Sequence, residues 1–320
     1  MSSASTPASP VRRHLPGTDL QVFPLCLGSN VFGWTADEAE SFAVLDAYAA
    51  AGGNFVDTAD VYSSWVPGHA GGESERIIGK WMASRRPRDI VVATKVGMLS
   101  GLEGLAAGTI RKAADASLAR LGVERIDLYY AHRDDPKTPI EETLRAFDGL
   151  VRAGKVRYVA ASNYTAPRLA EALAVSAREG LVRFVALQPH YNLMHRGEFE
   201  GDLAATCSRH ELGCVPYFGL AKGFLTGKYR PGAAVASARA DSARAYLDDR
   251  GSRVLRVLDE LAAVHRTTVA AVALAWLAAQ PAVVSPIASA RTAAQLADLL
   301  PMATLGLAAD EIARLTAASA

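Results

Sequence analysis

The sequence predicts an α/β protein in which eight parallel strands, each followed by a helix, close into a (β/α)8 barrel, the TIM-barrel class. Eight short β-rich runs alternate with longer stretches of helical periodicity along the chain, a pattern typical of parallel sheets. Runs such as Ile90–Ala93 are apolar at consecutive positions, as expected for strands that are covered on both faces. No shift in composition divides the chain, so we expect one barrel domain over residues 11–320.

The strands and helices are expected in strict alternation. The expected strands are Leu25–Gly28, Asn54–Asp57, Ile90–Lys95, Ile126–Ala131, Val156–Ser162, Phe184–Gln188, Gly213–Tyr217 and Val283–Pro286. The expected helices are Asp37–Ala51, Glu73–Ser84, Thr109–Leu121, Ile140–Ala153, Ala166–Ala177, Gly201–Glu211, Ser252–Val264, Val269–Ala279 and Ala293–Leu300. Gly52-Gly53 and Gly154 follow helical stretches, where glycine commonly ends a helix.

Two segments fall outside this alternation. Val11–Phe23 holds the turn sequence Pro16-Gly17-Thr18-Asp19 between two short β-like runs, and we expect a hairpin that plugs the bottom of the barrel. Ala221–Arg250, after the seventh strand, is a long stretch rich in Gly, Ala and Arg. Loops of that length inside a compact domain are usually functional or mobile.

Composition and charge exclude several classes of function. Lys plus Arg number 34 and Asp plus Glu 33, a formal net charge of +1, so no overall charge favours nucleic acid or an acidic membrane as a partner. Three cysteines are too few for a disulfide scaffold or a zinc site. Residues 1–10 lack the apolar core of a signal peptide and are expected to be a disordered tail. The apolar run Val269–Ala279 is too short to span a membrane. These observations favour a cytoplasmic protein.

Four chemically active side chains are expected at the carboxyl ends of neighbouring strands, where barrels carry their chemistry. Asp57 and Lys95 end the second and third strands, His132 follows the fourth, and Tyr62 lies in the loop after Asp57. Each of the four also has a purely structural alternative. Asp57 could cap a helix and Lys95 could be an ion-pair partner. His132 could be a core histidine, and Tyr62 could pack within its loop. Lys95 ends an apolar strand, however, and a buried ammonium needs a partner. Asp57 is the natural one.

Together the four residues suit proton donation to a carbonyl oxygen. An ammonium beside a phenol favours the phenolate, a carboxylate holds the ammonium in place, and a neutral imidazole can donate a hydrogen bond to a carbonyl. We see no obvious nucleophile and no His-Glu-x-x-His metal spacing, so no metal is expected. Carbonyl reduction with a hydride from a bound cofactor fits most simply.

The sequence resembles the aldo-keto reductase family over nearly its whole length, from Arg12 to Ser319. The segments that carry this resemblance are Asn54–Tyr62 (NFVDTADVY), Gly72–Glu75 with Gly79, Ala93–Lys95 (ATK), Asp127–His132 (DLYYAH), Gly154–Arg157, Ala161–Asn163, Gln188–Asn192 (QPHYN) and Gly223–Lys228. The resemblance implies a catalytic tetrad of Asp57, Tyr62, Lys95 and His132. Tyr62 is then the general acid.

The resemblance also implies a nicotinamide cofactor at the barrel mouth, with NADPH preferred over NADH. It implies that Ser162, Asn163 and Gln188 hold the carboxamide and that Tyr217 stacks on the nicotinamide. The remaining implied cofactor residues are Phe218, Gly219, Leu220, Lys222, Gly223 and Lys228 at the pyrophosphate, and Ser289, Arg291 and Gln295 near the 2′-phosphate. As alternatives to cofactor binding, Tyr217 could simply pack at the rim of the barrel, and Arg291 could be a solvent-exposed residue at the start of a helix. The sequence departs from the usual Tyr-Ser-Pro-Leu at Phe218-Gly219, and Leu299 replaces an Asn near the adenine, which bears on cofactor preference.

The substrate pocket is expected in the loops after strands one, two and four, with aromatic walls typical of small-molecule sites. The candidate walls are Asn30, Phe32, Trp34, Trp65 and Tyr191, some of which have a core-packing alternative. The segment Ser63–Gly72 resembles bacterial family members with broad activity on aldehydes and ketones. A cofactor-binding regulatory or redox-sensing barrel and an unrelated barrel hydrolase or isomerase remain alternatives. The natural substrate, the physiological direction and the oligomeric state are not readable from the sequence.

Overall fold

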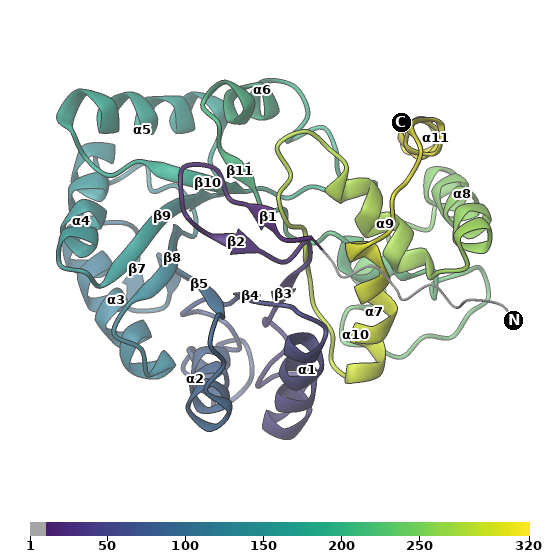
Figure 1. The fold of residues 1–320 in the computed structure, drawn as a ribbon, viewed down its shortest axis with the longest axis horizontal. Helices are drawn as coiled ribbons and strands as arrows, with labels where there is room; N and C mark the ends of the chain where they lie inside the picture. The colour runs from purple at the N-terminus through teal and green to yellow at the C-terminus, as the bar shows by residue number, and fades with distance from the viewer. Residues whose placement is uncertain (1–10) are drawn as a thin grey trace, which may run out of the picture.

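Eight parallel strands form a closed barrel in the computed structural model, which describes residues 11–320 (Figure 1). The expected tail, residues 1–10, lies outside the described residues. The strands are β3 (Cys26–Gly28), β4 (Phe55–Asp57), β5 (Val91–Val96), β8 (Ile126–Ala131), β9 (Val156–Ser162), β10 (Phe184–Gln188), β11 (Gly213–Cys214) and β12 (Ile287–Ala288). Their order is β11-β10-β9-β8-β5-β4-β3-β12. A bridge from Cys214 to Val283 and a 2.8 Å hydrogen bond from the Ile287 N–H to the Pro216 carbonyl join the two ends. The predicted barrel is confirmed.

The last strand lies later in the chain than expected. Val283–Pro286 was expected, whereas the segment paired with β3 is Ile287–Ala288. Val284 instead donates to the Cys214 carbonyl on the β11 side. Pro286 has no N–H, and its carbonyl accepts from the Cys26 N–H at 3.0 Å where the pairing with β3 begins.

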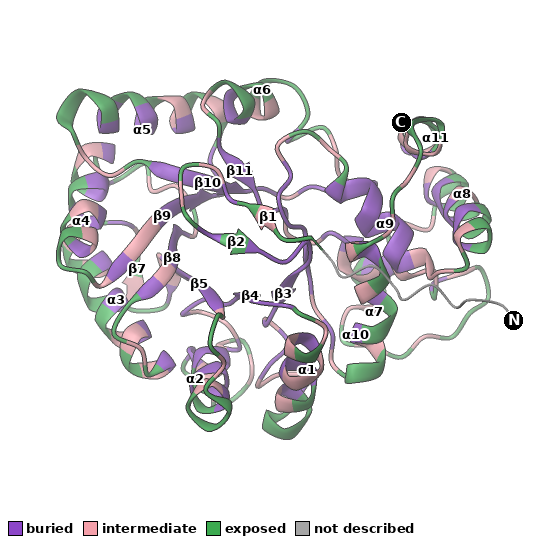
Figure 2. Cartoon of the chain, viewed as in Figure 1, coloured by how far each residue is buried: buried purple, intermediate pink, exposed green. Residues whose placement is uncertain are grey.

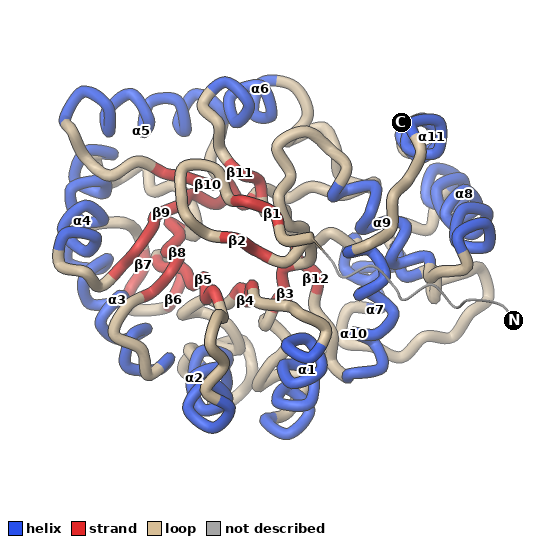
Figure 3. Tube along the Cα trace, viewed as in Figure 1, coloured by secondary structure: helices blue, strands red, loops and turns tan. Residues whose placement is uncertain are grey.

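Helices surround the barrel, as Figure 3 shows with blue helices around red strands. They are α1 (Glu38–Ala50), α2 (Glu73–Arg85), α3 (Ala107–Leu121), α4 (Ile140–Arg152), α5 (Ala166–Glu179), α6 (Asp202–Arg209), α7 (Ala240–Arg244), α8 (Asp249–His265), α9 (Val269–Ala278), α10 (Ala293–Leu299) and α11 (Ala309–Ala318). Buried residues lie on the helix faces toward the strands (Figure 2). Asp37 and Glu40 form a capping box at the start of α1, and Gly122 and Gly180 end α3 and α5 in left-handed conformation.

The expected hairpin fills the barrel interior from one end. Its strands β1 (Arg13–His14) and β2 (Gln21–Val22) pair antiparallel. Leu15, Leu20 and Val22 are buried in one apolar cluster with inward-facing strand residues such as Phe55 and Leu128. The hairpin therefore closes the end of the barrel opposite the carboxyl ends of the strands.

The structure adds elements that the sequence pattern did not predict. They are the hairpin β6 (Met98–Leu99) and β7 (Leu102–Glu103), the 3-10 segment Ala221–Thr226, α7, the 3-10 segment Leu300–Ala303, and α11. The long segment after β11 is thus partly helical, and α8 starts at Asp249 because the Asp248 side chain caps the Gly251 N–H. Within residues 11–320, no single helix has the length and apolar character needed to cross a bilayer; only α8 and α9 together do, and they are bent by 98°.

Candidate active site

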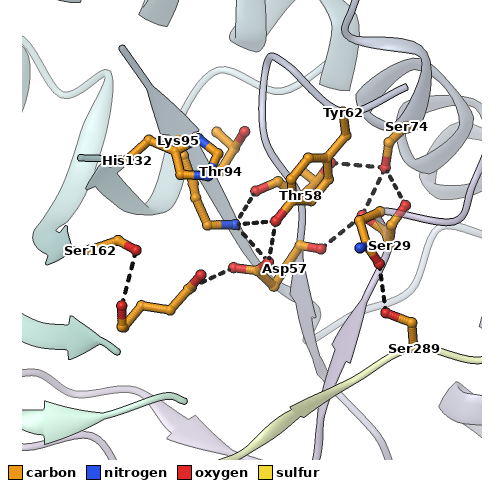
Figure 4. Close-up of polar contacts among 12 residues, drawn as sticks. Ser29, Asp57, Thr58, Tyr62, Ser74, Thr94, Lys95, His132, Ser162 and Ser289 are labelled. Carbon is orange, nitrogen blue, oxygen red and sulfur yellow. Dashed lines mark hydrogen bonds and ion pairs between the residues drawn. The ribbon is translucent and has the colours of Figure 1, made fainter. Parts of the chain in front are cut away.

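The four candidate catalytic residues meet at the carboxyl ends of three adjacent strands (Figure 4). Asp57 is the last residue of β4, Lys95 lies near the end of β5, and His132 follows β8 directly. Tyr62 reaches back from the loop after β4, and its hydroxyl lies 3.3 Å from Asp57 Oδ2. The parallel register of these strands thus gathers groups that are far apart in the sequence.

Lys95 is fully buried, and its ammonium has three acceptors. Lys95 Nζ donates to Asp57 Oδ2 at 2.6 Å, to the Thr58 carbonyl at 2.7 Å and to the Tyr62 hydroxyl at 2.9 Å. A buried charge is tolerated only when it is paired and hydrogen-bonded in this way. The ammonium is therefore fixed against the phenol oxygen.

The Tyr62 phenol is held in its protonated form. Burial raises its pKa well above the ordinary value, and the Asp57 carboxylate raises it further. The Arg239 guanidinium acts in the opposite direction and lowers this pKa. The protonated phenol of Tyr62 can therefore donate a proton, and the neighbouring Lys95 ammonium can stabilise the phenolate that results.

His132 provides a neutral imidazole beside Tyr62, with ring centroids 6.2 Å apart. Burial lowers the pKa of His132 well below its usual range, and the nearby Lys95 and Arg133 charges act in the same direction. Its Nδ1 is buried and has no hydrogen-bond partner within residues 11–320. A neutral ring can donate one hydrogen bond to a carbonyl oxygen placed next to the Tyr62 hydroxyl.

These groups open onto a cavity of about 1010 Å³. Asp57, Tyr62 and His132 line it, and Lys95 lies beneath Tyr62. Every residue that the family resemblance implies for the cofactor also lines it: Ser162, Asn163, Gln188, Tyr217, Phe218, Gly219, Leu220, Lys222, Gly223, Lys228, Ser289, Arg291 and Gln295. The structure brings these side chains together, and their roles stay predictions.

The residues expected at the carboxamide form one hydrogen-bonded group. Tyr217 donates from its hydroxyl to Asn163 Oδ1 at 2.8 Å, and Asn163 Nδ2 donates to the His132 carbonyl at 2.9 Å. Ser162 donates to the Gln188 carbonyl. Gln188 Nε2 donates to Asp57 Oδ1 at 2.8 Å, so its side chain is already bound to the candidate catalytic carboxylate.

The substrate-wall predictions divide into two groups. Asn30, Trp34 and Trp65 line the cavity, and the two indoles pack edge to face with centroids 5.5 Å apart. Phe32 and Tyr191 do not line it. Both are almost fully buried in the hydrophobic core, so the expectation that they form walls is corrected.

Arg239 is a cavity residue that sequence reasoning missed. Its guanidinium lies 5.4 Å from the Trp34 ring centroid and 5.9 Å from that of Phe218, and burial lowers its pKa. The sequence feature that could have pointed to Arg239 is its position as a basic residue within the long Gly/Ala-rich segment.

Five cations line the cavity without an ion-pair partner among residues 11–320: Arg133, Lys222, Lys228, Arg239 and Arg291. Next to them, Phe218, Ala221 and Lys222 have φ values of 54°, 46° and 58°. Non-glycine residues rarely adopt such values, which cluster at ligand-binding sites. Cations without an ion-pair partner in the described part of the chain suit the phosphates of a dinucleotide.

Comparison with known proteins supplies the family. Residues 24–320 match the Aldo/keto reductase family. The chain is 32% identical to norsolorinic acid reductase A of Aspergillus parasiticus over 290 residues, 85% of this chain and 71% of that protein. It is 34% identical to a probable voltage-gated potassium channel subunit beta of Oryza sativa and to the uncharacterized oxidoreductase YrpG of Bacillus subtilis. Both matches cover 86% of this chain and 85% of the relative.

Proposed function

This chain belongs to the aldo/keto reductase family of oxidoreductases, and we propose that it reduces an aldehyde or ketone to an alcohol with NADPH. The observation that carries the proposal is the 2.9 Å contact between the Lys95 ammonium and the Tyr62 hydroxyl at the floor of the cavity. Five cations that have no ion-pair partner within residues 11–320 line the same cavity. The first feature suits proton donation and the second suits a phosphate-bearing cofactor.

The chain's own residues account for the proton and for the carbonyl's orientation. His132 donates a hydrogen bond to the carbonyl oxygen and directs it toward Tyr62. Tyr62 gives its proton to that oxygen as negative charge develops there, and Lys95 stabilises the phenolate that remains. Asp57 keeps Lys95 in place through the 2.6 Å ion pair. A nicotinamide cofactor held by the cavity residues would supply the hydride for the carbonyl carbon.

The cavity residues fit a nicotinamide cofactor. Ser162, Asn163 and Gln188 offer amide and hydroxyl groups for the carboxamide, and Tyr217 offers a ring face for the nicotinamide. Phe218–Gly223 with Lys228 suits the pyrophosphate. Arg291 with Ser289 and Gln295 suits a 2′-phosphate, because such a group needs a cation and hydrogen-bond donors. NADPH is therefore proposed over NADH.

The proposed substrate is a small carbonyl compound bound against Trp34, Trp65 and Asn30. We propose a cytoplasmic protein that acts without nucleic acid or membrane. The second candidate function is a cofactor-binding regulatory or redox-sensing barrel with little turnover, which the similarity to a probable potassium channel subunit beta favours. The hydrogen-bonded Asp57–Lys95–Tyr62 arrangement supports the catalytic proposal over that alternative.

Titration with NADPH and NADH, followed by turnover in the same cuvette, tests the proposal. Quenching of tryptophan fluorescence measures the affinity for each cofactor, and NADPH oxidation is then followed with a panel of aldehydes and ketones. Tight NADPH binding with oxidation supports the reductase. Tight binding with very slow oxidation by every carbonyl favours the regulatory barrel, and no binding contradicts both.

A further inference from the structure

A cluster of two histidines and a glutamate lies beside the cavity, outside the proposed catalytic group. His190 and His195 follow β10, and Glu198 is one turn further along the chain. One side-chain atom from each of the three lies within 4.8 Å of the other two. His195 Nε2 is 3.1 Å from Glu198 Oε2.

The nitrogen atoms of this cluster lack the contacts that a structural histidine normally has. Nε2 of His190 and Nε2 of His195 are both buried, and neither makes a hydrogen bond within residues 11–320. The 3.1 Å approach of Glu198 to His195 therefore does not satisfy hydrogen-bond geometry. Buried polar atoms are usually paired, so two adjacent unpaired ring nitrogens need an explanation.

We propose that His190, His195 and Glu198 bind a divalent transition-metal ion of the zinc class. Two imidazole nitrogens and one carboxylate oxygen form a ligand set that zinc accepts, and a water molecule completes the tetrahedron. With metal–ligand bonds of about 2.0–2.1 Å, ligand atoms lie about 3.4 Å apart. The His195–Glu198 pair is already close to that spacing.

The present ring arrangement shows which side chain moves when a metal binds. The two imidazoles are stacked, with centroids 3.7 Å apart and planes 12° apart. A metal ion lies in the plane of each ring that binds it, so one ring must turn. His190 is sandwiched, because Tyr217 stacks on it at 5.2 Å. The His195 side chain is 28% exposed and that of Glu198 is 73% exposed. These two side chains are therefore the ones that turn to bring their ligand atoms to the metal.

The site lies directly behind the cavity wall. Tyr217 follows β11, the neighbour of β10 in the sheet (Figure 1). Its ring contacts His190 while its hydroxyl donates to Asn163 in the cavity. A bound metal therefore fixes the histidine on which this cavity residue rests. This inference does not depend on the proposed carbonyl reduction.

Isothermal titration of the whole protein with zinc chloride tests the site, with cobalt chloride as a spectroscopic probe. We expect one zinc per chain, and visible cobalt bands of a tetrahedral site with nitrogen and oxygen ligands. His190→Asn and His195→Asn should each weaken zinc binding by about 100-fold, since each removes a direct ligand. Glu198→Gln, at an exposed position, should weaken it by a smaller factor without affecting folding.

His265→Asn is the matched control. His265 pairs with Glu311 at 2.8 Å on another part of the molecule but lacks a second histidine, so this variant should bind zinc like the unaltered chain. The proposal is overturned if zinc does not bind at one equivalent. It is equally overturned if the His195→Asn and Glu198→Gln variants, shown to be folded by circular dichroism, bind zinc as tightly as the His265→Asn variant.

Discussion

Single residues at the barrel mouth carry charges that the surrounding structure must balance. Lys95 is balanced by Asp57 and by two further oxygen acceptors. Asp60, three residues after Asp57, is in the opposite situation. It is fully buried, and neither carboxylate oxygen has a hydrogen-bond partner within residues 11–320. Burial and the nearby Glu75 carboxylate raise the pKa of Asp60 to about 7.

Asp60 should therefore make the stability of this protein fall as the pH rises. The carboxyl group titrates near 3.8 when unfolded and near 7 when folded, so the folded state holds the proton more tightly. Its favourable contribution is complete below pH 3.8 and is lost as the pH rises to about 7. Asp60→Asn removes this dependence. The variant should be close to the unaltered chain in stability near pH 4 and more stable near pH 8, by up to about 4 kcal/mol.

Urea unfolding at several pH values measures this difference. Asp298→Asn, which changes an exposed carboxyl group at the cavity rim, is the control and should leave the pH dependence unchanged. A constant stability difference between Asp60→Asn and the unaltered chain from pH 4 to 8 would show that Asp60 is charged throughout.

At the scale of elements, the contact between α2 and α3 depends on one glycine. A Cβ atom at Gly79 would lie 2.4 Å from the Arg120 carbonyl oxygen and 2.8 Å from that of Leu121. Backbone atoms cannot yield as a flexible side chain would. Gly79→Ala should therefore destabilise the protein by about 1–3 kcal/mol, measured by urea unfolding.

Gly149 provides the matched comparison. It also lies inside a helix, α4, but a Cβ atom there would meet nothing within 4 Å. Gly149→Ala should stabilise the protein by up to about 1 kcal/mol, because alanine favours the helix. If Gly79→Ala stabilises the protein as Gly149→Ala does, helix propensity rather than the contact between α2 and α3 decides the effect.

The same scale shows what the sequence could predict. The end of a strand was predictable where an apolar run stops at a charged residue, as at Asp57, the last residue of β4. The last strand was placed too early, because Val283 and Val284 pair with β11 while the segment after Pro286 pairs with β3. Helix α11 was not predicted.

The candidate site residues also differ in how far the sequence could predict their positions. The polar and charged residues expected at the strand ends lie together around one cavity, because the carboxyl ends of parallel strands meet at the same mouth. Phe32 and Tyr191 were assigned to the cavity wall, yet both are core residues, because an aromatic side chain suits either place. Arg239 was missed because only the folding of the long segment after β11 brings its guanidinium over Trp34.

For the whole molecule, the distribution of charge matters more than its sum. The net charge is only +1, yet five cations without an ion-pair partner in the described part of the chain line one cavity. Such a local concentration of positive charge attracts an anionic ligand even when the net charge of the chain is near zero.

Arg291→Ala tests this at the cofactor. Loss of one charged hydrogen-bonding partner of a 2′-phosphate should weaken NADPH binding by about 10- to 100-fold, while NADH, which lacks that phosphate, should change little. Fluorescence titration gives both affinities. Arg314→Ala removes an arginine paired with Glu260 on the surface and should affect neither cofactor. Equal losses of NADPH and NADH affinity in Arg291→Ala would place the 2′-phosphate elsewhere.

The most direct test of the proposed reaction is the rate of NADPH oxidation by the Tyr62→Phe variant, measured beside its affinity for NADPH. The substitution removes the proton donor and keeps the ring. Carbonyl reduction should therefore fall by at least about 100-fold, with NADPH affinity nearly unchanged. Undiminished reduction in a variant that still binds NADPH would contradict the assignment of Tyr62 as the general acid.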